Sequence, residues 1–435
     1  MSGELERASL IENLRFNAVA VIPAAVQGLF SRRRVAVGAA TRAGVDGQAL
    51  ALLEGMARRY ERRPIWIRLG REPAVLVLDP EDGARILEGE PEQFASDPPS
   101  KRNGMLAFQP DAVTISRGAM WRNRRRFNEA VLSRGDDKLL RTWLDACDDE
   151  LERMLAGPVA IAGGELGWQA FHPMMQRIAR RIVLGNGAAE DEALTRLLAD
   201  LMAEANALPG ETGPEVERLE DMIAEHVDRA DRGSLVSRFS AAPSTARTNA
   251  VGQVPHWLFA LGDTLAINSF RALAVLGSDD APLAPARRSR DFLRGCLQEA
   301  MRLWPTTPML VRETVRAVEI GGERIPKGTQ VVISNLLGHR DRSRLDQADR
   351  FAPMRWFDGE ASSDPGINHF SRGPQACPGA ALALGVGEEV LSALIGRLTP
   401  RTFSGSVDIT RPMPHMLDFF AIGIRLDPVR APAGV

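Results

Sequence analysis

Residues 370–379 read FSRGPQACPG, the most informative segment of the chain. A single cysteine, Cys377, lies here between Gly373 and Gly379, at the start of a stretch with helical periodicity. The N–H groups at a helix N-terminus carry partial positive charge and stabilise a thiolate, and glycines let a flat partner approach the backbone. A thiolate with hydrogen-bond donors directed at its sulfur is what an axial ligand of haem iron requires. The alternative is a buried structural cysteine with incidental glycines.

Four further motifs lie upstream of this segment. Residues 121–125 read WRNRR, residues 260–264 read ALGDT, residues 299–302 read EAMR and residues 351–356 read FAPMRW. The spacing of Glu299 and Arg302 puts both charges on one helix face, although such pairs are abundant on solvated helices. The neighbouring acid and hydroxyl of Asp263 and Thr264 can deliver protons. Taken alone, this pair in an apolar helix is more often a polar-face accident.

The five motifs, in this order, resemble the signatures of the cytochrome P450 superfamily, in its soluble bacterial type. The segment 370–379 is similar to the haem-binding pattern F-x-x-G-x-[HR]-x-C-x-G, and Gln375 stands where the family usually has histidine or arginine. The likeness runs from about residue 64 to residue 425. It implies haem b (iron protoporphyrin IX) as the cofactor, with Cys377 as the ligand of the iron.

The resemblance also implies roles for side chains elsewhere in the chain. Trp121, Arg125 and Arg312 would anchor the haem through its propionates, and Asp263 and Thr264 would be catalytic, delivering protons to dioxygen. The expected site residues are Cys377 for the metal; Trp121, Arg125, Arg312, Phe370, Gly373, Gln375 and Gly379 for the cofactor; and Asp263 and Thr264 for catalysis.

Three more expectations come from the same resemblance. Glu299, Arg302 and Arg355 would form a buried structural cluster near the cysteine segment. Leu261 replaces the family's usual glycine and Gly262 follows one place later, which leaves the shape of the oxygen groove open. The arginines beside the anchor, at 122, 124 and 126, are expected on a solvated helix face, where they would attract an acidic redox partner.

The periodicity predicts a mainly α fold with a smaller β region (α+β), built as a single large P450-like haem domain. Two strands and a helix are expected over residues 64–90, a long loop over 91–117, and mostly helices over 118–304, with breaks near 135–137, 157–164, 185–187, 209–214 and 241–245. A hairpin of residues 314–319 and 328–333 is expected around Gly321 and Gly322. The haem domain is expected at 61–435, and residues 1–60 form an N-terminal segment packed on it.

Composition limits the function classes. The 435 residues carry 54 basic and 56 acidic side chains, a formal charge of -2, which argues against bulk nucleic-acid binding. Three widely spaced cysteines give no disulfide framework, so a reducing, cytoplasmic location is expected. The apolar run at 18–30 is too short for an integral membrane span; it is expected to pack on the domain, with a peripheral, membrane-apposed helix as the alternative.

The function expected from these features is that of a haem-thiolate monooxygenase, which inserts one oxygen atom of O2 into a lipophilic substrate. A peroxide-driven peroxygenase and a non-catalytic haem-thiolate binding module remain as alternatives. No G-x-G-x-x-G dinucleotide fingerprint lies at a strand–helix junction. Electrons are therefore expected from separate proteins, a ferredoxin or flavodoxin with its reductase.

Overall fold

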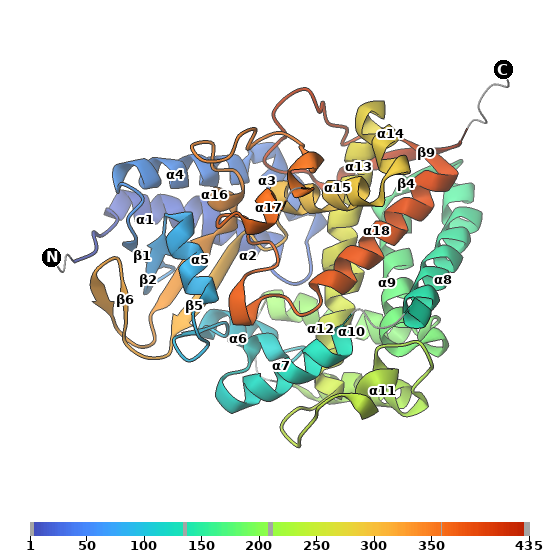
Figure 1. The fold of residues 1–435 in the computed structure, drawn as a ribbon, viewed down its shortest axis with the longest axis horizontal. Helices are drawn as coiled ribbons and strands as arrows, with labels where there is room; N and C mark the ends of the chain where they lie inside the picture. Colours follow the sequence, from blue (N-terminus) through green and yellow to red (C-terminus); the bar gives the residue numbers. More distant parts are fainter. Residues whose placement is uncertain (1–3, 134–136, 208–211, 358, 430–435) are drawn as a thin grey trace.

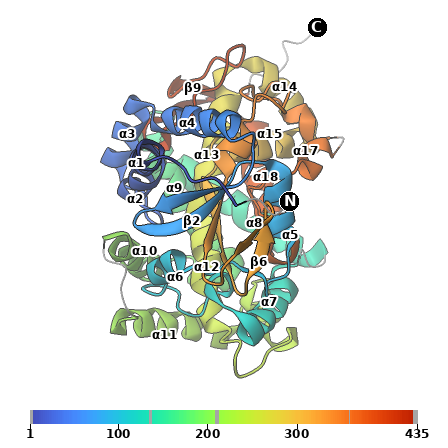
Figure 2. The ribbon, with the colours of Figure 1, turned by 90° about the vertical axis from the view of Figure 1, so that its left-hand side faces the viewer.

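The structure is a computed structural model that describes residues 4–133, 137–207, 212–357 and 359–429. Helices make up most of this part of the chain, and the strands form three small sheets, so the predicted fold class is confirmed (Figure 1). The two views agree in placing α4 and α11 at opposite ends of the molecule (Figures 1 and 2).

The helices follow the chain in a long series, interrupted by short strands. The α-helices of the first half are α1 (Leu10–Phe16), α2 (Ile22–Gln27), α3 (Arg34–Ala43), α4 (Val45–Arg59), α5 (Pro80–Glu88), α6 (Pro99–Met105), α7 (Gly118–Leu132), α8 (Asp137–Met154), α9 (Trp168–Leu184) and α10 (Glu192–Ala207). Those of the second half are α11 (Pro214–Arg229), α12 (Val254–Phe259), α13 (Ala266–Ser278), α14 (Asp280–Arg288), α15 (Arg290–Leu303), α16 (Asn335–His339), α17 (Glu360–Ser363) and α18 (Ala380–Arg397). Three π-helical segments lie at Asn17–Val21, Leu155–Val159 and Ala260–Leu265.

A five-stranded sheet has the order β1-β2-β8-β5-β3, in which only β2 and β8 run parallel. A second sheet has the order β4-β10-β9, and β6 pairs with β7 alone. The strands are β1 (Ile65–Leu69), β2 (Glu72–Val77), β3 (Phe94–Ala95), β4 (Glu165–Gly167), β5 (Met309–Thr314), β6 (Val318–Ile320), β7 (Glu323–Ile325), β8 (Gln330–Ser334), β9 (Leu398–Ser404) and β10 (Gly423–Pro428).

The predicted hairpin at residues 314–333 is wrong in its pairing. Gly321 and Gly322 turn β6 directly into β7, because both have positive φ, at 60° and 88°. β8 pairs instead with β5, with Arg312 opposite Val331. The two expected strands are therefore four, and β5 begins at Met309, before the predicted start.

Two other predicted loops need correction. Residues 91–117 contain β3, α6 and a 3-10 turn at Val113–Ile115, so the segment is not a single loop. The helical pattern continues through the π-helical segment Leu155–Val159 and ends only after Ile161. The breaks predicted at 135–137 and 209–214 lie partly outside the described residues.

A continuous helical run, Val251–Ser278, crosses the centre of the fold. Among the described residues it is the one helix long and apolar enough to cross a membrane, yet 72% of its most apolar window is buried inside the protein. Phe270, Leu273 and Leu276 on this run are fully enclosed. It therefore serves as the central core helix, against which α9, α15 and β9 pack.

The N-terminal helices cover the five-stranded sheet. Phe16, Leu53 and Met56 share a buried apolar cluster with side chains of β1 and β2. Arg7 forms a parallel bridge to Trp66 in β1, and the backbone N–H of Leu5 donates to the carboxylate of Glu323. This packing holds the first helices beside the link between α15 and β5.

Candidate active site

The cysteine segment folds into a tight loop that ends at the N-terminus of α18. The backbone N–H of Cys377 donates to the carbonyl of Phe370 at 2.8 Å, and the backbone N–H of Gly379 bonds to the Cys377 sulfur. Cys377 itself is exposed, unlike the other two cysteines of the chain, which are buried. Burial raises the pKa of the thiol, against the opposing effects of the Gly379 N–H and the Arg125 charge. A metal bound here would displace the thiol proton.

The two glycines of the segment have different roles. Gly373 has a φ of 63°, and a Cβ there would lie 2.5 Å from the Cα of Glu88, so the loop packs directly on the end of α5. Gly379 has negative φ, and its Cβ would make only an ordinary contact, 3.6 Å from Leu132. Gln375 fixes the loop on another side, because its Nε2 donates to the carbonyl of Phe94 in β3 at 2.6 Å. The ring of Phe370 lies against His369, with the centroids 4.7 Å apart.

Arg312 lies beside the loop as a buried cation without a counter-ion. Its Nη2 donates to the hydroxyl of Ser371 at 2.8 Å, its Nε has no partner, and no carboxylate of the described residues lies within 4.0 Å. Burial lowers the pKa of Arg312 to about 10. The pKa of Lys101 falls to about 7, through burial and then through repulsion by Arg312. The ammonium group of Lys101 donates to Ser96 and Thr114, and Asp97 partly offsets the repulsion. Arg312 is therefore the cation of this region that has no ion-pair partner among the described residues.

The arginines of α7 have different surroundings: one contacts the cysteine loop and another is buried in the protein. Nη1 of Arg125 donates to the carbonyl of Ala376, next to the cysteine, while its Nε lies 2.7 Å from Glu129. Trp121 is partly buried on the same helix, and no hydrogen bond from its indole is described. Arg125 therefore borders the cysteine loop, and Trp121 stands one helical turn before it on α7.

The expectation that the neighbouring arginines are solvated is wrong for Arg124. Its side chain is 4% exposed, because its guanidinium pairs with Asp111 and donates to the hydroxyl of Ser116 at 2.8 Å. Arg122 and Arg126 are exposed, and Arg122 pairs with Glu92 at 2.6 Å.

Asp263 and Thr264 lie within the π-helical segment Ala260–Leu265. The sequence left open whether the central helix is distorted here, and the structure shows that it is. The carboxylate of Asp263 is held by α9: Oδ1 lies 2.9 Å from Nε2 of His172, and Oδ2 accepts from Nε2 of Gln176 at 3.0 Å. A Cβ on Gly262 would lie 2.9 Å from the Gln176 side chain. The displaced glycine thus makes room for the amide that holds Asp263.

Glu299 and Arg302 form a fully buried ion pair at 2.7 Å, and Arg355 lies 3.3 Å from the same carboxylate, so the predicted cluster is confirmed. The indole of Trp356 and the backbone N–H of Ala352 also donate to it, at 3.1 and 3.0 Å. Burial raises the pKa of Glu299, but these charges and hydrogen bonds together hold the pKa below its usual value. The cluster ties α15 to the segment that precedes the cysteine loop.

Sequence reasoning missed three side chains near the site: Lys101, His172 and Gln176. Lys101 is one of three lysines in an arginine-rich chain, which was a usable signal. His172 and Gln176 stand one helical turn apart on α9, but nothing in the sequence links them to Asp263, 91 and 87 residues away. The other two cysteines, Cys147 and Cys296, are buried in the core, and burial raises the pKa of each thiol.

The residues present fit a haem. Cys377 is the exposed cysteine of the chain and can serve as a ligand of the iron. The partnerless Nε of Arg312, with Lys101 nearby, suits the carboxylates that haem carries. Arg125 contacts the loop at Ala376. Arg312 is the donor without an anion among the described residues, and a carboxylate of the cofactor would supply one.

The sequence model of the family "Cytochrome P450" matches residues 273–406, which include the Glu299 cluster, Arg312 and Cys377. Cytochrome P450 315a1, mitochondrial, of Drosophila melanogaster is 32% identical over 148 residues, 32% of this chain and 28% of the relative. Sterol 26-hydroxylase, mitochondrial, of Homo sapiens is 28% identical over 210 residues, 42% of this chain and 39% of the relative. Cyclooctatin synthase of Streptomyces melanosporofaciens is 30% identical over 127 residues, 29% of this chain and 27% of the relative.

Each of these matches spans less than two fifths of the relative's own length. The predicted cytoplasmic location is wrong, because three of the matched relatives are named as mitochondrial proteins. The ordered motifs, the fold and these matches together support membership of the cytochrome P450 superfamily.

Proposed function

We propose that the chain is a haem-thiolate monooxygenase that inserts one oxygen atom of O2 into a lipophilic organic substrate. The observation that carries the proposal is that one loop, inside the segment that matches the family, carries an exposed Cys377 and bonds through Ser371 to the buried Arg312, whose Nε has no partner. Haem b, when bound, supplies the chemistry of oxygen activation. The protein binds and orients the cofactor and the substrate and supplies protons.

Three side chains would hold the cofactor's carboxylates. Arg312 would bond through its free Nε, and Arg125 through its guanidinium, which already points at the cysteine loop. Lys101 would contribute its positive charge, because its ammonium group already donates to Ser96 and Thr114. Gln375 is engaged with Phe94, so it would fix the loop rather than reach a carboxylate. Cys377 would give its sulfur to the iron, with the Gly379 N–H stabilising the thiolate.

Protons would reach the oxygen side through Asp263 and Thr264. His172 is partly exposed and touches the Asp263 carboxylate, so it can pass protons from solvent to that carboxylate. The Thr264 side chain follows Asp263 on the same distorted turn. An acid that is connected to solvent in this way favours the use of O2 over hydrogen peroxide.

Electrons would come from a separate ferredoxin or flavodoxin with its reductase. Arg122 and Arg126 on α7 are exposed on the helix that carries Arg125, and they offer positive charge to an acidic partner. Arg124 takes no part, because it is buried.

Turnover measurements separate the proposed function from its alternatives. The haem-loaded protein is supplied with a lipophilic substrate and with O2 plus a ferredoxin or flavodoxin and its reductase, or with hydrogen peroxide alone. A monooxygenase forms product only in the first mixture. Product only with peroxide would identify a peroxygenase, and ligand binding without product in either mixture would identify a binding module.

We also propose that the first helices contact a membrane surface. Leu10, Ile11, Leu14, Ile22 and Val26 are 52–74% exposed along one continuous helical run, where a soluble surface would carry polar side chains. Exposed arginines at 15, 33 and 34 accompany this apolar stripe and suit anionic lipid.

A further inference from the structure

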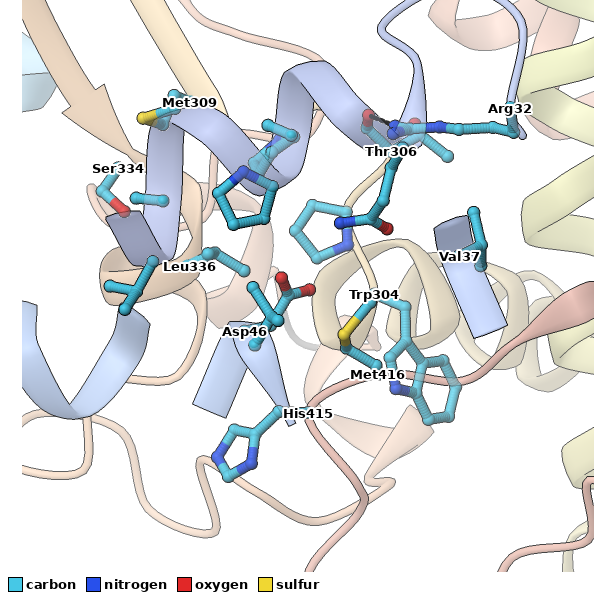
Figure 3. A pocket seen from close by; sticks show the side chains of 18 of the residues that line it. Arg32, Val37, Asp46, Trp304, Thr306, Met309, Ser334, Leu336, His415 and Met416 are labelled. Carbon is cyan, nitrogen blue, oxygen red and sulfur yellow. Dashed lines mark hydrogen bonds between the residues drawn. The ribbon is translucent and has the colours of Figure 1, made fainter. Parts of the chain in front are cut away.

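A cavity is lined on one side by residues 19–27 of the first helices (Figure 3). Its volume is about 60 Å³, counted as the space open to the centres of water-sized molecules, and it opens to solvent. Neither Cys377 nor Arg312, Lys101, Asp263 or Thr264 lines it. It is therefore a separate space from the candidate haem site.

Most of the cavity wall is apolar. The inner face of the first helices contributes one side, and α13 and the link from α15 to β5 contribute the others. The apolar lining consists of Val19, Ala20, Pro23, Ala24, Val37, Val45, Leu53, Ile267, Trp304, Pro305, Pro308, Met309, Leu336, Met416 and Phe419.

Three charged side chains reach this apolar space. Arg271 comes from α13, Arg32 from the turn before α3, and Asp46 from the first turn of α4. In Figure 3 the Asp46 carboxylate points into the hollow, and Arg32 reaches the carbonyl of Thr306. Charges from three separate elements thus converge on one cavity.

Within the described part of the chain, none of the three charges has an ion-pair partner within 4.0 Å. Arg271 donates from Nε to Leu417 and from Nη1 to Trp304, both at 3.0 Å, and its Nη2 makes no described bond. Arg32 donates only from Nη2, to Thr306 at 2.8 Å. Two guanidinium groups therefore keep N–H donors free toward the cavity.

Burial makes this arrangement costly for the free protein. Burial, together with the nearby positive charge of Arg32, lowers the pKa of Arg271 to about 9. Burial also lowers the pKa of Arg32. Burial raises the pKa of Asp46 despite the attraction of both arginines. Buried charges are normally paired, and here neither arginine has a carboxylate of the described residues within 4.0 Å, although Asp46 and Asp418 act on Arg271 from further away. His415, also in the wall, has its pKa lowered by burial and adds no charge at neutral pH.

We propose that this cavity is a second ligand site, which binds a lipophilic molecule that carries one carboxylate. The carboxylate accepts hydrogen bonds from Arg32 and Arg271, and the hydrocarbon lies on the surface formed by Ile267, Met309 and Met416. The ligand reaches the cavity under the apolar helical run, whose outer face carries Leu14, Ile22 and Val26. This inference does not depend on the proposed function.

Calorimetric titration of the haem-loaded protein with dodecanoate tests the proposal, with 1-dodecanol and dodecyltrimethylammonium as probes of equal chain length. Dodecanoate should bind at least about tenfold more tightly than either, because only it offers acceptors to the guanidinium groups. Arg32→Met should weaken dodecanoate binding by about tenfold or more. Arg58→Met is the control, because Arg58 is exposed and does not line the cavity. The affinity of this variant for dodecanoate should equal that of the wild type.

Asp46→Asn removes the negative charge near the two arginines and keeps the shape of the side chain, so it should not weaken the binding of dodecanoate. Its affinity for dodecanoate should stay the same or rise, because the change can only remove a repulsion. The proposal is overturned if Arg32→Met binds like the wild type, if Asp46→Asn weakens binding, or if the alcohol binds as tightly as the acid. It is also overturned if dodecanoate shifts the haem absorption band with the same midpoint in the wild type and in Arg32→Met, because the ligand would then occupy the haem site. A protein without thiolate-bound haem that still binds dodecanoate through Arg32 would contradict the proposed function and support this site.

Discussion

Nε2 of His172 lies 2.9 Å from Oδ1 of Asp263, which joins α9 to the π-helical turn of the central helix. His172 is partly exposed and stacks on Trp168, with ring centroids 4.8 Å apart. The imidazole therefore has a fixed orientation, contact with solvent and contact with the acid. These are the properties of a residue that relays protons.

The first prediction concerns this relay. Asp263→Asn should slow O2 consumption by about 10²-fold, because a positioned proton donor contributes roughly 10²–10⁴-fold. His172→Phe keeps the stacking on Trp168 but removes the ring nitrogens, and it should slow the same step and raise the solvent isotope effect. Haem content and substrate binding, measured by absorption, should not change.

Thr264→Ala is the contrast, because it removes a hydroxyl further along the same route. O2 should still be consumed, but a larger share of the electrons should leave as hydrogen peroxide. If Asp263→Asn and Thr264→Ala both keep the rate and the yield of product per electron, protons arrive by another route.

The second prediction concerns cofactor retention. Arg312→Leu should release haem to an acceptor protein at least about tenfold faster, because a charge-assisted hydrogen bond to a carboxylate is lost. Arg316→Leu is the control, since Arg316 is exposed four residues later. Equal haem release by the two variants would show that Arg312 does not hold the cofactor.

The third prediction concerns stability. Glu299→Gln should lower the free energy of unfolding by about 3–5 kcal/mol, because it leaves Arg302 buried without its counter-charge. Chemical denaturation of the haem-loaded protein measures the change. A Gln variant with wild-type stability would contradict the structural role of the cluster.

The Glu299 cluster also sets a pH dependence. The folded state holds the pKa of Glu299 below its usual value of 4.5. Its stabilising effect is therefore complete above about pH 4.5 and is lost as the pH falls through the lower pKa of the folded state. The stability difference between wild type and Glu299→Gln should shrink over that acidic range.

The fourth prediction concerns the apolar stripe on the first helices. Wild-type protein should cosediment with vesicles that contain anionic lipid, and the double variant Leu14→Glu with Ile22→Glu should lose about 90% of this binding, because it places charge on the apolar face. Ile161→Glu is the control, since Ile161 is 89% exposed in a different part of the chain. Equal sedimentation of the double variant and wild type would refute the contact.

The sequence predicted what depends on local pattern. The cysteine segment, the Glu299–Arg302 pair and the position of Asp263 next to Thr264 are short motifs, and the structure places the first two as expected. Arg124 was misplaced because four arginines within five positions cannot all face solvent on one packed helix, and the sequence does not say which one turns inward.

Contacts between distant segments could not be predicted. His172 meets Asp263 only because α9 packs on the π-helical turn, and Arg32 meets Arg271 only because the first helices fold over the α15–β5 link. The hairpin failed for a related reason. Residues 314–333 contain several short apolar segments that could pair with one another as strands. Which of them pair depends on the contacts of β8 with β2 and β5, which lie elsewhere in the chain.

The most direct test of the account is the absorption spectrum of the reduced protein with carbon monoxide. Thiolate ligation by Cys377 predicts the red-shifted Soret band in the wild type, its loss in Cys377→His, and its retention in Cys147→Ala and Cys296→Ala, whose thiols are buried in the core. A red-shifted band that persists in Cys377→His, or its absence from haem-loaded wild-type protein, would contradict the central claim.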